Sequence, residues 1–383
     1  MFEKEKQENL KAIRQFEAAP PKAESWDGSV DFFPRYMQIE HTTRCNARCI
    51  MCNHLYTANR GAGDIDVNVL YGLEEILPYA ETAMLNGDGE PLLYANIDQS
   101  LALLRKYGVK VGTNTNLTVI PDGLWAYFAD SFAFLNISCD GSTAELYENI
   151  RKGLSFADFA KNLKKLNQVA PQLRKNLDCV LMRQNIGDME NLVRFAAEQG
   201  FASVRFHTLG VNPIIGNQKD APMLYGHYLA DNAEKAAQTA RALGIRIQLP
   251  AVVRPAEGSV ALDLQRICDE EPAARARVEK VAQYREQLSC QYLGTPVQPE
   301  DLTPATFAYG DLCRWAVERC YIDLHGNMTT CCYDVSHRYG NLKEQSFREI
   351  WNGPLYRQLR WEMVQGRLPA WCRTCQWLKN PEF

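Results

Sequence analysis

The stretch Gln38-Ile-Glu-His-Thr-Thr-Arg-Cys45-Asn-Ala-Arg-Cys49-Ile-Met-Cys52 sets three cysteines in the spacing CxxxCxxC directly after a strand-like segment. Three thiolates on one short loop can ligate three irons of a four-iron cube, because soft sulfur ligands suit iron–sulfur sites. The fourth iron then has no protein ligand and can bind another molecule. The alternatives are a zinc loop or reduced bystander thiols. Zinc sites usually combine two cysteine pairs, whereas only three cysteines lie here.

Strand-like and helical segments alternate on both sides of this loop. The predicted strands are Tyr36–Glu40, Thr82–Leu85, Val109–Thr113, Phe134–Cys139, Leu177–Met182 and Val204–His207. The helices predicted between them include Ile97–Lys106, Phe156–Val169 and Met189–Gln199. Six βα units of this spacing predict an α/β fold with a parallel sheet curved into a partial (β/α)6 barrel. Such sheets carry their chemistry at the carboxyl ends of the strands.

The composition indicates a soluble, cytoplasmic protein. Hydrophobic residues make up 46% and charged residues 23% of 383, so a sizeable core is expected. The net charge of −4 argues against nucleic acid as a partner, and no run of about 18–20 apolar residues predicts a membrane helix. The charged N-terminus is unlike a secretory signal. In a reducing compartment, clustered thiols among the 13 cysteines indicate metal binding rather than disulfides.

The predicted elements divide the chain into four parts. They are an N-terminal helix and loop (1–34), the barrel (35–215), a helical interdomain segment (216–311) and a small α+β domain (312–383). The third part is expected to hold a long helix over about Ala221–Leu243, a strand over Ile245–Leu249 and further helix over 262–290. The fourth is expected to hold a hairpin, Arg319–Leu324 with Met328–Cys332, and two helices, Phe347–Trp351 and Leu355–Gln365.

The CxxxCxxC loop after the first strand of a βα series resembles the radical S-adenosylmethionine (SAM) superfamily. The resemblance covers about residues 35–210. In that family the vacant iron chelates SAM, and electron transfer cleaves a C–S bond to give a 5′-deoxyadenosyl radical that abstracts hydrogen from a substrate. The resemblance implies a [4Fe-4S] cluster on Cys45, Cys49 and Cys52, SAM as cofactor, and a reductant such as flavodoxin or ferredoxin as partner.

Later segments resemble further motifs of the same family, in order. Asn86–Pro91 resembles its GGEP motif, which binds the SAM amino group, although Asp88 replaces a small residue. Thr113–Asn116 resembles its TNG turn, although Leu117 stands where glycine is common. Ser138–Gly141 resembles its SxDG segment. Any one of these segments is equally consistent with a purely structural role.

The resemblance also suggests how side chains contact SAM. Period-two alternation puts Ser138 and Asp140 on one face, and likewise Arg183 and Asn185 at the end of the fifth strand. Arg183 would pair with the SAM carboxylate, Asn185 would bond the ribose, and Met51 would pack against adenine. The implied SAM-contacting residues are Met51, Gly87, Asp88, Gly89, Glu90, Asn114, Ser138, Arg183 and Asn185.

A second group of cysteines lies near the C-terminus. The segment from Cys313 to Cys375 resembles the SPASM/twitch extension of radical SAM enzymes, in its shorter, twitch-like form. That form implies one auxiliary [4Fe-4S] cluster held by Cys313, Cys331, Cys372 and Cys375, which suits electron transfer. Cys332 or Cys320 can replace Cys331, and a structural zinc site with four cysteine ligands is the alternative.

The substrate is predicted less directly than the radical chemistry. We expect a small polar substrate, a carbohydrate or aminocyclitol as in natural product biosynthesis, that is epimerised or dehydrogenated. The alternatives are a ribosomal peptide substrate, or a non-catalytic iron–sulfur electron carrier. Glu40 and Asp140 are catalytic candidates because they lie at strand ends. An epimerase needs a hydrogen donor, for which Cys179 (predicted to face the barrel) and Cys268 are candidates, though buried cysteines often only fill a core.

Overall fold

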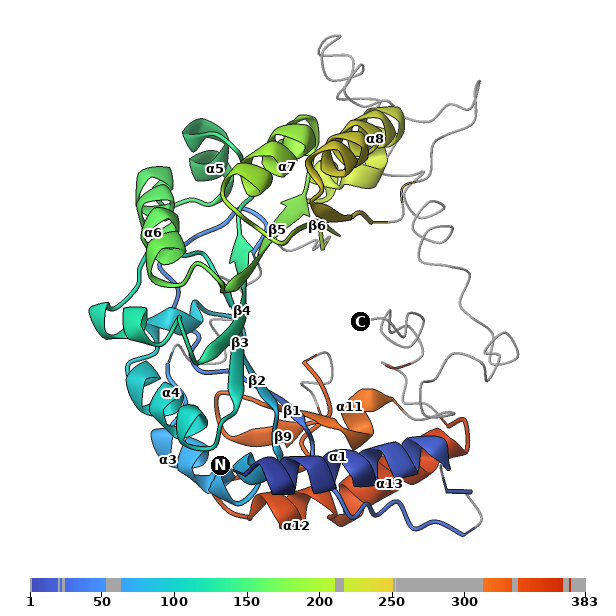
Figure 1. The fold of residues 1–383 in the computed structure, drawn as a ribbon. Coiled ribbons are helices and arrows are strands. Elements are labelled where there is room, and N and C mark those ends of the chain that lie inside the picture. The colour runs from blue at the N-terminus through green and yellow to red at the C-terminus, as the bar shows by residue number, and fades with distance from the viewer. Residues whose placement is uncertain are drawn as a thin grey trace.

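A curved ten-stranded sheet forms the centre of the computed structural model (Figure 1). The structure describes residues 2–19, 21–22, 25–52, 63–210, 217–250, 252, 313–332, 337–367 and 372. Its strands run in the order β10-β9-β8-β1-β2-β3-β4-β5-β6-β7. Their bounds are β1 Tyr36–Ile39, β2 Thr82–Leu85, β3 Lys110–Thr115, β4 Phe132–Ser138, β5 Arg174–Leu181, β6 Ser203–Thr208, β7 Arg246–Gln248, β8 Arg319–Ile322, β9 Asn327–Thr329 and β10 Gly340–Asn341.

Helices cover the convex side of this sheet and leave its concave side open in Figure 1. The α-helices are α1 Glu3–Ala18, α3 Val67–Tyr71, α4 Ile97–Lys106, α5 Ala144–Ile150, α6 Phe156–Val169, α7 Met189–Glu198, α8 Gly226–Leu243, α11 Arg314–Val317, α12 Phe347–Trp351 and α13 Pro354–Val364. Short 3-10 helices span Gly72–Glu75, Leu77–Tyr79, Pro91–Leu93, Asp122–Ala126, Ile186–Asp188, Asn217–Asp220 and Pro222–Tyr225.

The predicted α/β fold with a partial barrel is confirmed. Strands β1 to β6 are the six predicted ones, and each pairs in parallel with its neighbour. Side-chain alternation separates two faces. On β4 and β5, Leu135, Ile137 and Leu177 are fully buried against the helices, as the apolar side of a covered sheet requires. Asn136 and Asp178 alternate with them and belong to the concave face.

The C-terminal hairpin extends the barrel sheet instead of forming a sheet of its own. Strand β8 pairs in parallel with β1, so that Tyr36 lies opposite Arg319 and Ile39 opposite Ile322. The predicted hairpin itself is present, because β9 returns antiparallel to β8. Two strands that pair in parallel can lie far apart in the chain, so the strand pattern alone did not indicate this pairing.

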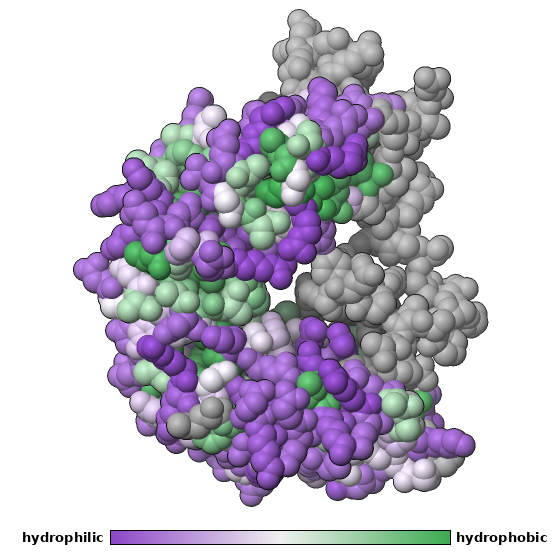
Figure 2. Space-filling model, in the orientation of Figure 1, coloured by the Kyte–Doolittle hydropathy of each residue, from purple (hydrophilic) through white to green (hydrophobic). Residues whose placement is uncertain are grey.

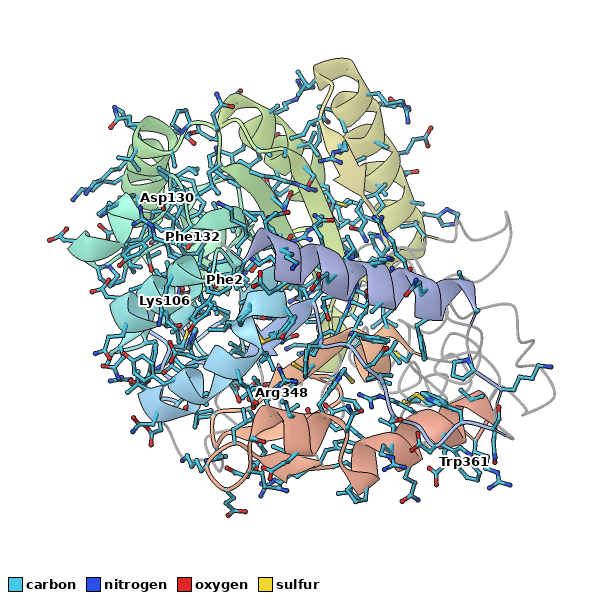
Figure 3. The ribbon with its side chains drawn as sticks, turned by 60° about the horizontal axis from the view of Figure 1, so that its bottom comes forward. Phe2, Lys106, Asp130, Phe132, Arg348 and Trp361 are labelled. Atoms are coloured by element: carbon cyan, nitrogen blue, oxygen red, sulfur yellow. The ribbon has the colours of Figure 1, made fainter. Side chains whose placement is uncertain are left out.

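The N-terminal segment contacts both the barrel and helix α12. Asn9 of α1 bonds both backbone groups of Phe33, at 3.0 and 2.9 Å. Phe2 packs on Tyr107 at a ring distance of 4.9 Å, and the Arg348 guanidinium lies 4.3 Å over the ring of Phe33 (Figure 3). These contacts hold the amino ends of the strands, on the side opposite to the motif loops.

Two further expectations concern the remaining segments. The helix predicted over Ala221–Leu243 is a 3-10 turn, Pro222–Tyr225, followed by α8. The helix predicted over 262–290 lies outside the described residues, and the four-part division of the chain remains a prediction.

None of the described helices combines the length and apolar character that crossing a membrane requires. The surface seen in Figure 2 is mainly hydrophilic, with apolar residues gathered over α7 and α8.

Candidate functional site

The CxxxCxxC loop leaves the carboxyl end of β1. Cys49 is 9% exposed, and Cys45 and Cys52 are half-buried. Burial raises the pKa of the Cys49 thiol to about 11 and also raises the pKa of Cys45. A thiolate at either position therefore requires a nearby cation, which iron supplies. Within the described ranges, no three His, Cys, Asp or Glu side chains converge as a metal site.

The segment after α5 braces this loop from below. The backbone N–H groups of Arg48 and Ile50 donate to the carbonyls of Lys152 and Ile150, at 2.7 and 3.0 Å. Between these two contacts lies Arg151, which is buried and reaches Cys49. We did not single out Arg151 from the sequence, because nothing in the pattern Ile-Arg-Lys-Gly distinguishes a buried arginine from an exposed one.

The loop Asn86–Glu90 lies directly against the cysteine loop. The Glu90 backbone N–H donates to the carbonyl of Arg44 at 2.8 Å. A Cβ on Gly89 would lie 2.6 Å from that same oxygen, and closer still to the carbonyl oxygen of Thr42. Only glycine permits this approach of two backbones. The side-chain oxygen Oδ1 of Asn86 is buried without a hydrogen-bond partner among the described residues, which fits an incoming donor such as the SAM amino group.

The Glu90 carboxylate is bound by the chain itself. It accepts hydrogen bonds from the Thr115 hydroxyl at 2.7 Å and from the backbone N–H of Asn116 at 2.8 Å. These contacts fasten the second motif loop to the turn after β3. In that turn Leu117 has a φ of 59°, the left-handed conformation that explains why glycine is common at this place in the resembling motif. Glu90 therefore positions two loops, and its contact with SAM remains a prediction.

Glu40 fastens the same loop to the C-terminal hairpin. Its carboxylate accepts from the backbone N–H of Asp88 at 3.0 Å and from that of Leu324 at 3.2 Å. Gly87 leaves room for it, since a Cβ there would lie 2.7 Å from the Glu40 carboxyl carbon. These contacts make Glu40 a positioning residue at the junction of β1, the loop and β8. Its predicted catalytic role stays a prediction.

Asp140 and Ser138 do not lie on one strand face as predicted. Strand β4 ends at Ser138, and Asp140 turns into the protein, where it is fully buried. One Asp140 oxygen accepts from the Val180 N–H at 2.7 Å, and the other lies 2.8 Å from the Arg151 guanidinium. The period-two argument failed here because the strand stops two residues earlier. Asp140 thus forms a buried ion pair with Arg151, as a structural residue does. Its predicted catalytic role stays a prediction.

The prediction that Cys179 faces the barrel interior is wrong. Cys179 is fully buried with Leu177 and Leu181 on the convex, helix-covered face of β5. Its neighbour Asp178 lies on the concave face and pairs with Arg205. The parity was counted from Arg183, but β5 ends at Leu181, so the alternation does not continue that far. The other thiol candidate, Cys268, lies outside the described residues.

Arg183 and Asn185 likewise do not share a strand face, because both lie in the turn after β5. The Asn185 side chain is buried and bonds the backbone of that turn, accepting from Met182 N–H at 2.8 Å. Arg183 pairs with Asp220 at 3.2 Å and is partly exposed. Met51 packs on a small apolar cluster at these strand ends, formed by Ile150, Met182 and Leu209. The SAM contacts implied for these residues stay predictions.

The auxiliary-site cysteines are partly described. Cys313, Cys331, Cys332 and Cys372 are all half-buried, whereas Cys375 lies outside the described residues. Cys320 is fully buried within β8, and burial raises its pKa far above the ordinary value. This position in the apolar core disfavours Cys320 as a ligand and leaves Cys331 and Cys332 as the alternatives after β9.

Comparison with known proteins decides the family. The family model of the radical SAM superfamily matches residues 39–196, and the model of the SPASM iron-sulfur cluster-binding domain matches residues 313–376. The chain belongs to the radical SAM superfamily. It is a radical SAM enzyme with SAM and a [4Fe-4S] cluster as cofactors, and its SPASM domain adds auxiliary iron–sulfur binding.

This radical SAM enzyme is also similar to curated relatives and to solved structures. The AdoMet-dependent heme synthase of Methanosarcina barkeri is 23% identical over 358 residues, or 90% of this chain and 89% of the relative. The mycofactocin maturase MftC of Mycobacterium ulcerans is 25% identical over 186 residues, covering 48% of this chain and 49% of the relative. The structure of Streptococcus suis SuiB bound to the precursor peptide SuiA has a TM-score of 0.59 at 17% identity, covering 92% of this chain and 71% of SuiB, which shows the shared fold.

Burial of Glu90 makes the stability of the cofactor-free radical SAM enzyme depend on pH. Burial raises the pKa of Glu90 from 4.5 to about 7. Because the folded-state pKa is the higher one, the stabilisation is present below about pH 4.5 and is lost as the pH rises through about 7. For wild type we expect the free energy of unfolding to be about 2–3 kcal/mol higher at pH 5 than at pH 8 because of this group. Glu90→Gln should lack this difference, which urea unfolding at the two pH values measures. The exposed variant Glu145→Gln is the control, and identical pH profiles for wild type and Glu90→Gln would contradict the prediction.

Proposed function

We propose that this radical SAM enzyme abstracts hydrogen from a small polar substrate of the carbohydrate or aminocyclitol type, held on the concave face of the sheet. When bound, the cluster and SAM supply the 5′-deoxyadenosyl radical. The observation that carries the proposal is a row of polar side chains across four strands at the same level of the barrel.

This row consists of Asn114, Asn136, Asn176 and Ser203, which are register partners on β3 to β6. Asn136 donates to Asn114 at 2.8 Å, Asn176 to Asn136 at 3.0 Å, and the Ser203 hydroxyl to Asn176 at 2.8 Å. Each amide carries two donors and two acceptor sites, so these bonds leave hydrogen-bonding capacity on every asparagine. Neutral groups of this kind suit a substrate rich in hydroxyl or amino groups.

A charged group lies one level nearer the motif loops. Asp178 and Arg205 form a two-pronged ion pair at 2.6 and 2.8 Å, and His207 lies 3.7 Å from Asp178. Their side chains are 18%, 27% and 45% exposed, so a ligand on the concave face can reach them. Asp178 and Arg205 would orient the substrate, while His207 would accept a proton.

The concave face favours dehydrogenation over epimerisation. Epimerisation requires a hydrogen donor there. Of the two thiol candidates, Cys179 faces the opposite side of the sheet, and Cys268 lies outside the described residues. Dehydrogenation requires a base that takes a proton from the substrate radical and an acceptor for its remaining electron. His207 beside Asp178 would be the base, and the auxiliary cluster of the SPASM domain would accept the electron. We therefore propose a dehydrogenase in which His207 is the base.

Peptide modification is the second candidate. It is supported by the names of two relatives, the mycofactocin maturase and SuiB in complex with its precursor peptide. The heme synthase relative, which matches most of this chain, adds a porphyrin as a third class worth assaying.

The test is a substrate panel. Anaerobically reconstituted protein with SAM and dithionite is incubated with aminocyclitols and monosaccharides, with short peptides, or with an iron porphyrin. We expect 5′-deoxyadenosine to rise above the substrate-free level only with the first group, together with a product lighter by two hydrogens. Stimulation by peptide or porphyrin alone would overturn the substrate class, and no 5′-deoxyadenosine under any condition would favour an electron carrier.

Arg205 offers a site-directed test of the same proposal. We expect Arg205→Gln to lower kcat/KM for the polar substrate about 10- to 100-fold, since hydrogen bonds from charged groups contribute about 1.5–3 kcal/mol. Substrate-free SAM cleavage should stay unchanged. Arg174→Gln is the matched control, because Arg174 is exposed at the opposite end of neighbouring β5. Equal kcat/KM values for wild type and Arg205→Gln would remove Arg205 from substrate binding.

A further inference from the structure

Arg151 is the one buried cation that reaches the cysteine loop among the described residues. It follows α5 and is 8% exposed. Its Nη1 donates to the Sγ atom of Cys49 at 3.9 Å, within hydrogen-bond range for sulfur, and its Nη2 lies 2.8 Å from Asp140. The guanidinium thus spans a predicted cluster ligand on one side and a buried carboxylate on the other.

The protein fixes this guanidinium in place. Asp140 is itself anchored, because its other oxygen accepts from the backbone N–H of Val180 in β5 at 2.7 Å. The residues on either side of Arg151 form the two backbone hydrogen bonds that brace the cysteine loop. Arg151 therefore cannot turn to solvent without losing a buried ion pair, a change that costs several kcal/mol. The guanidinium therefore places a positive charge at a fixed position beside Cys49.

Hydrogen bonds to the sulfur atoms of an iron–sulfur cluster, together with nearby charge and burial, set its reduction potential. A reduced cluster carries one more negative charge than an oxidised one. A cation that donates to a ligating sulfur stabilises the reduced form more than the oxidised form. Asp140 opposes this effect through its own negative charge, while its contact holds Arg151 in position.

We propose that Arg151 raises the reduction potential of the SAM-binding cluster by donating to Cys49, and that Asp140 sets how far. Arg151 is thus a positioning residue that governs how readily a biological reductant loads the electron needed for SAM cleavage. The inference rests on the proposed cluster at Cys45, Cys49 and Cys52, but not on the proposed substrate. A purely structural brace is the competing explanation, and it affects how much cluster binds rather than its potential.

The experiment is a redox titration of the reconstituted protein followed by electron paramagnetic resonance. The signal of this cluster is identified as the one that changes when SAM is added. Wild type is compared with Arg151→Gln, Arg151→Lys and Asp140→Asn. Lys152→Gln is the control, because it removes the adjacent, exposed positive charge. Iron and sulfide analysis reports the amount of cluster in each variant separately.

We expect the reduced-to-oxidised ratio of Arg151→Gln, at a fixed potential, to fall about tenfold, which equals about 59 mV for one electron. Arg151→Lys should fall between this variant and wild type, Asp140→Asn should shift in the opposite direction, and Lys152→Gln should match wild type. If Arg151→Gln binds no cluster, the other two site variants decide, and wild-type potentials in both would overturn the inference. A wild-type protein without a SAM-responsive signal would instead refute the cluster site itself.

Discussion

Replacing Cys49 with alanine is expected to abolish both the SAM-binding cluster and SAM cleavage. Cys49 is the most buried of the three cysteines on the loop, and the buried groups Arg151 and Asp140 lie near it. Two thiolates cannot hold three irons of the cube, so iron content should fall by about four per chain. Formation of 5′-deoxyadenosine should drop by at least about 1,000-fold, because no other group generates the radical. Iron analysis and product chromatography of anaerobic preparations measure both effects.

The control for this variant is Cys139→Ala. Cys139 is fully buried at the end of β4 and packs in the apolar core, so its loss should cost about 1 kcal/mol of stability but leave SAM cleavage intact. Comparable activity losses in the two variants would point to unfolding as the cause. Full turnover by Cys49→Ala, with wild-type folding, would contradict the assignment of the cluster to this loop.

Local sequence patterns predicted the parts of the fold that local chemistry determines. Strands β1 to β6 were predicted within about three residues at each end, because apolar runs bounded by turn residues mark buried parallel strands. The motif loops were predicted at the carboxyl ends of β1 to β4 for the same reason. The cysteine spacing predicted an iron–sulfur site, because three thiolates lie within one short loop, and the resemblance to the radical SAM superfamily implied the radical chemistry.

Features that depend on register or on distant pairing were not predictable in this way. The predicted orientation of Cys179 was wrong because its parity was counted from Arg183, which lies beyond the end of β5 at Leu181, where the alternation of side chains no longer holds. The pairing of β8 with β1 joins residues far apart in the chain, and alternation within either strand does not reveal its partner. Arg151 was missed because only tertiary packing buries it. The polar row on β3 to β6 was visible only once the register aligned four strands.

Replacing Gly89 with alanine is expected to uncouple the loop Asn86–Glu90 from the cysteine loop. A methyl group there would overlap the carbonyl oxygens of Thr42 and Arg44, the latter at 2.6 Å. Both are backbone atoms close to Cys45 in the chain, so they cannot move aside as a flexible side chain would. The hydrogen bond from Glu90 N–H to the Arg44 carbonyl, now 2.8 Å, would lengthen or break. Overpacking of this kind costs about 1–3 kcal/mol of stability.

The functional loss in Gly89→Ala should exceed this loss of stability, because the predicted SAM site uses both loops. We expect SAM affinity to fall at least about tenfold, because a loss of about 1.4 kcal/mol in binding free energy already has that effect. Equilibrium dialysis measures the affinity. Gly210→Ala is the matched control, because a Cβ there meets no atom of the described residues within 4 Å. Wild-type SAM affinity in Gly89→Ala would mean that the approach of the two backbones is not needed for the site. An equal loss in Gly210→Ala would mean that the effect does not come from this contact.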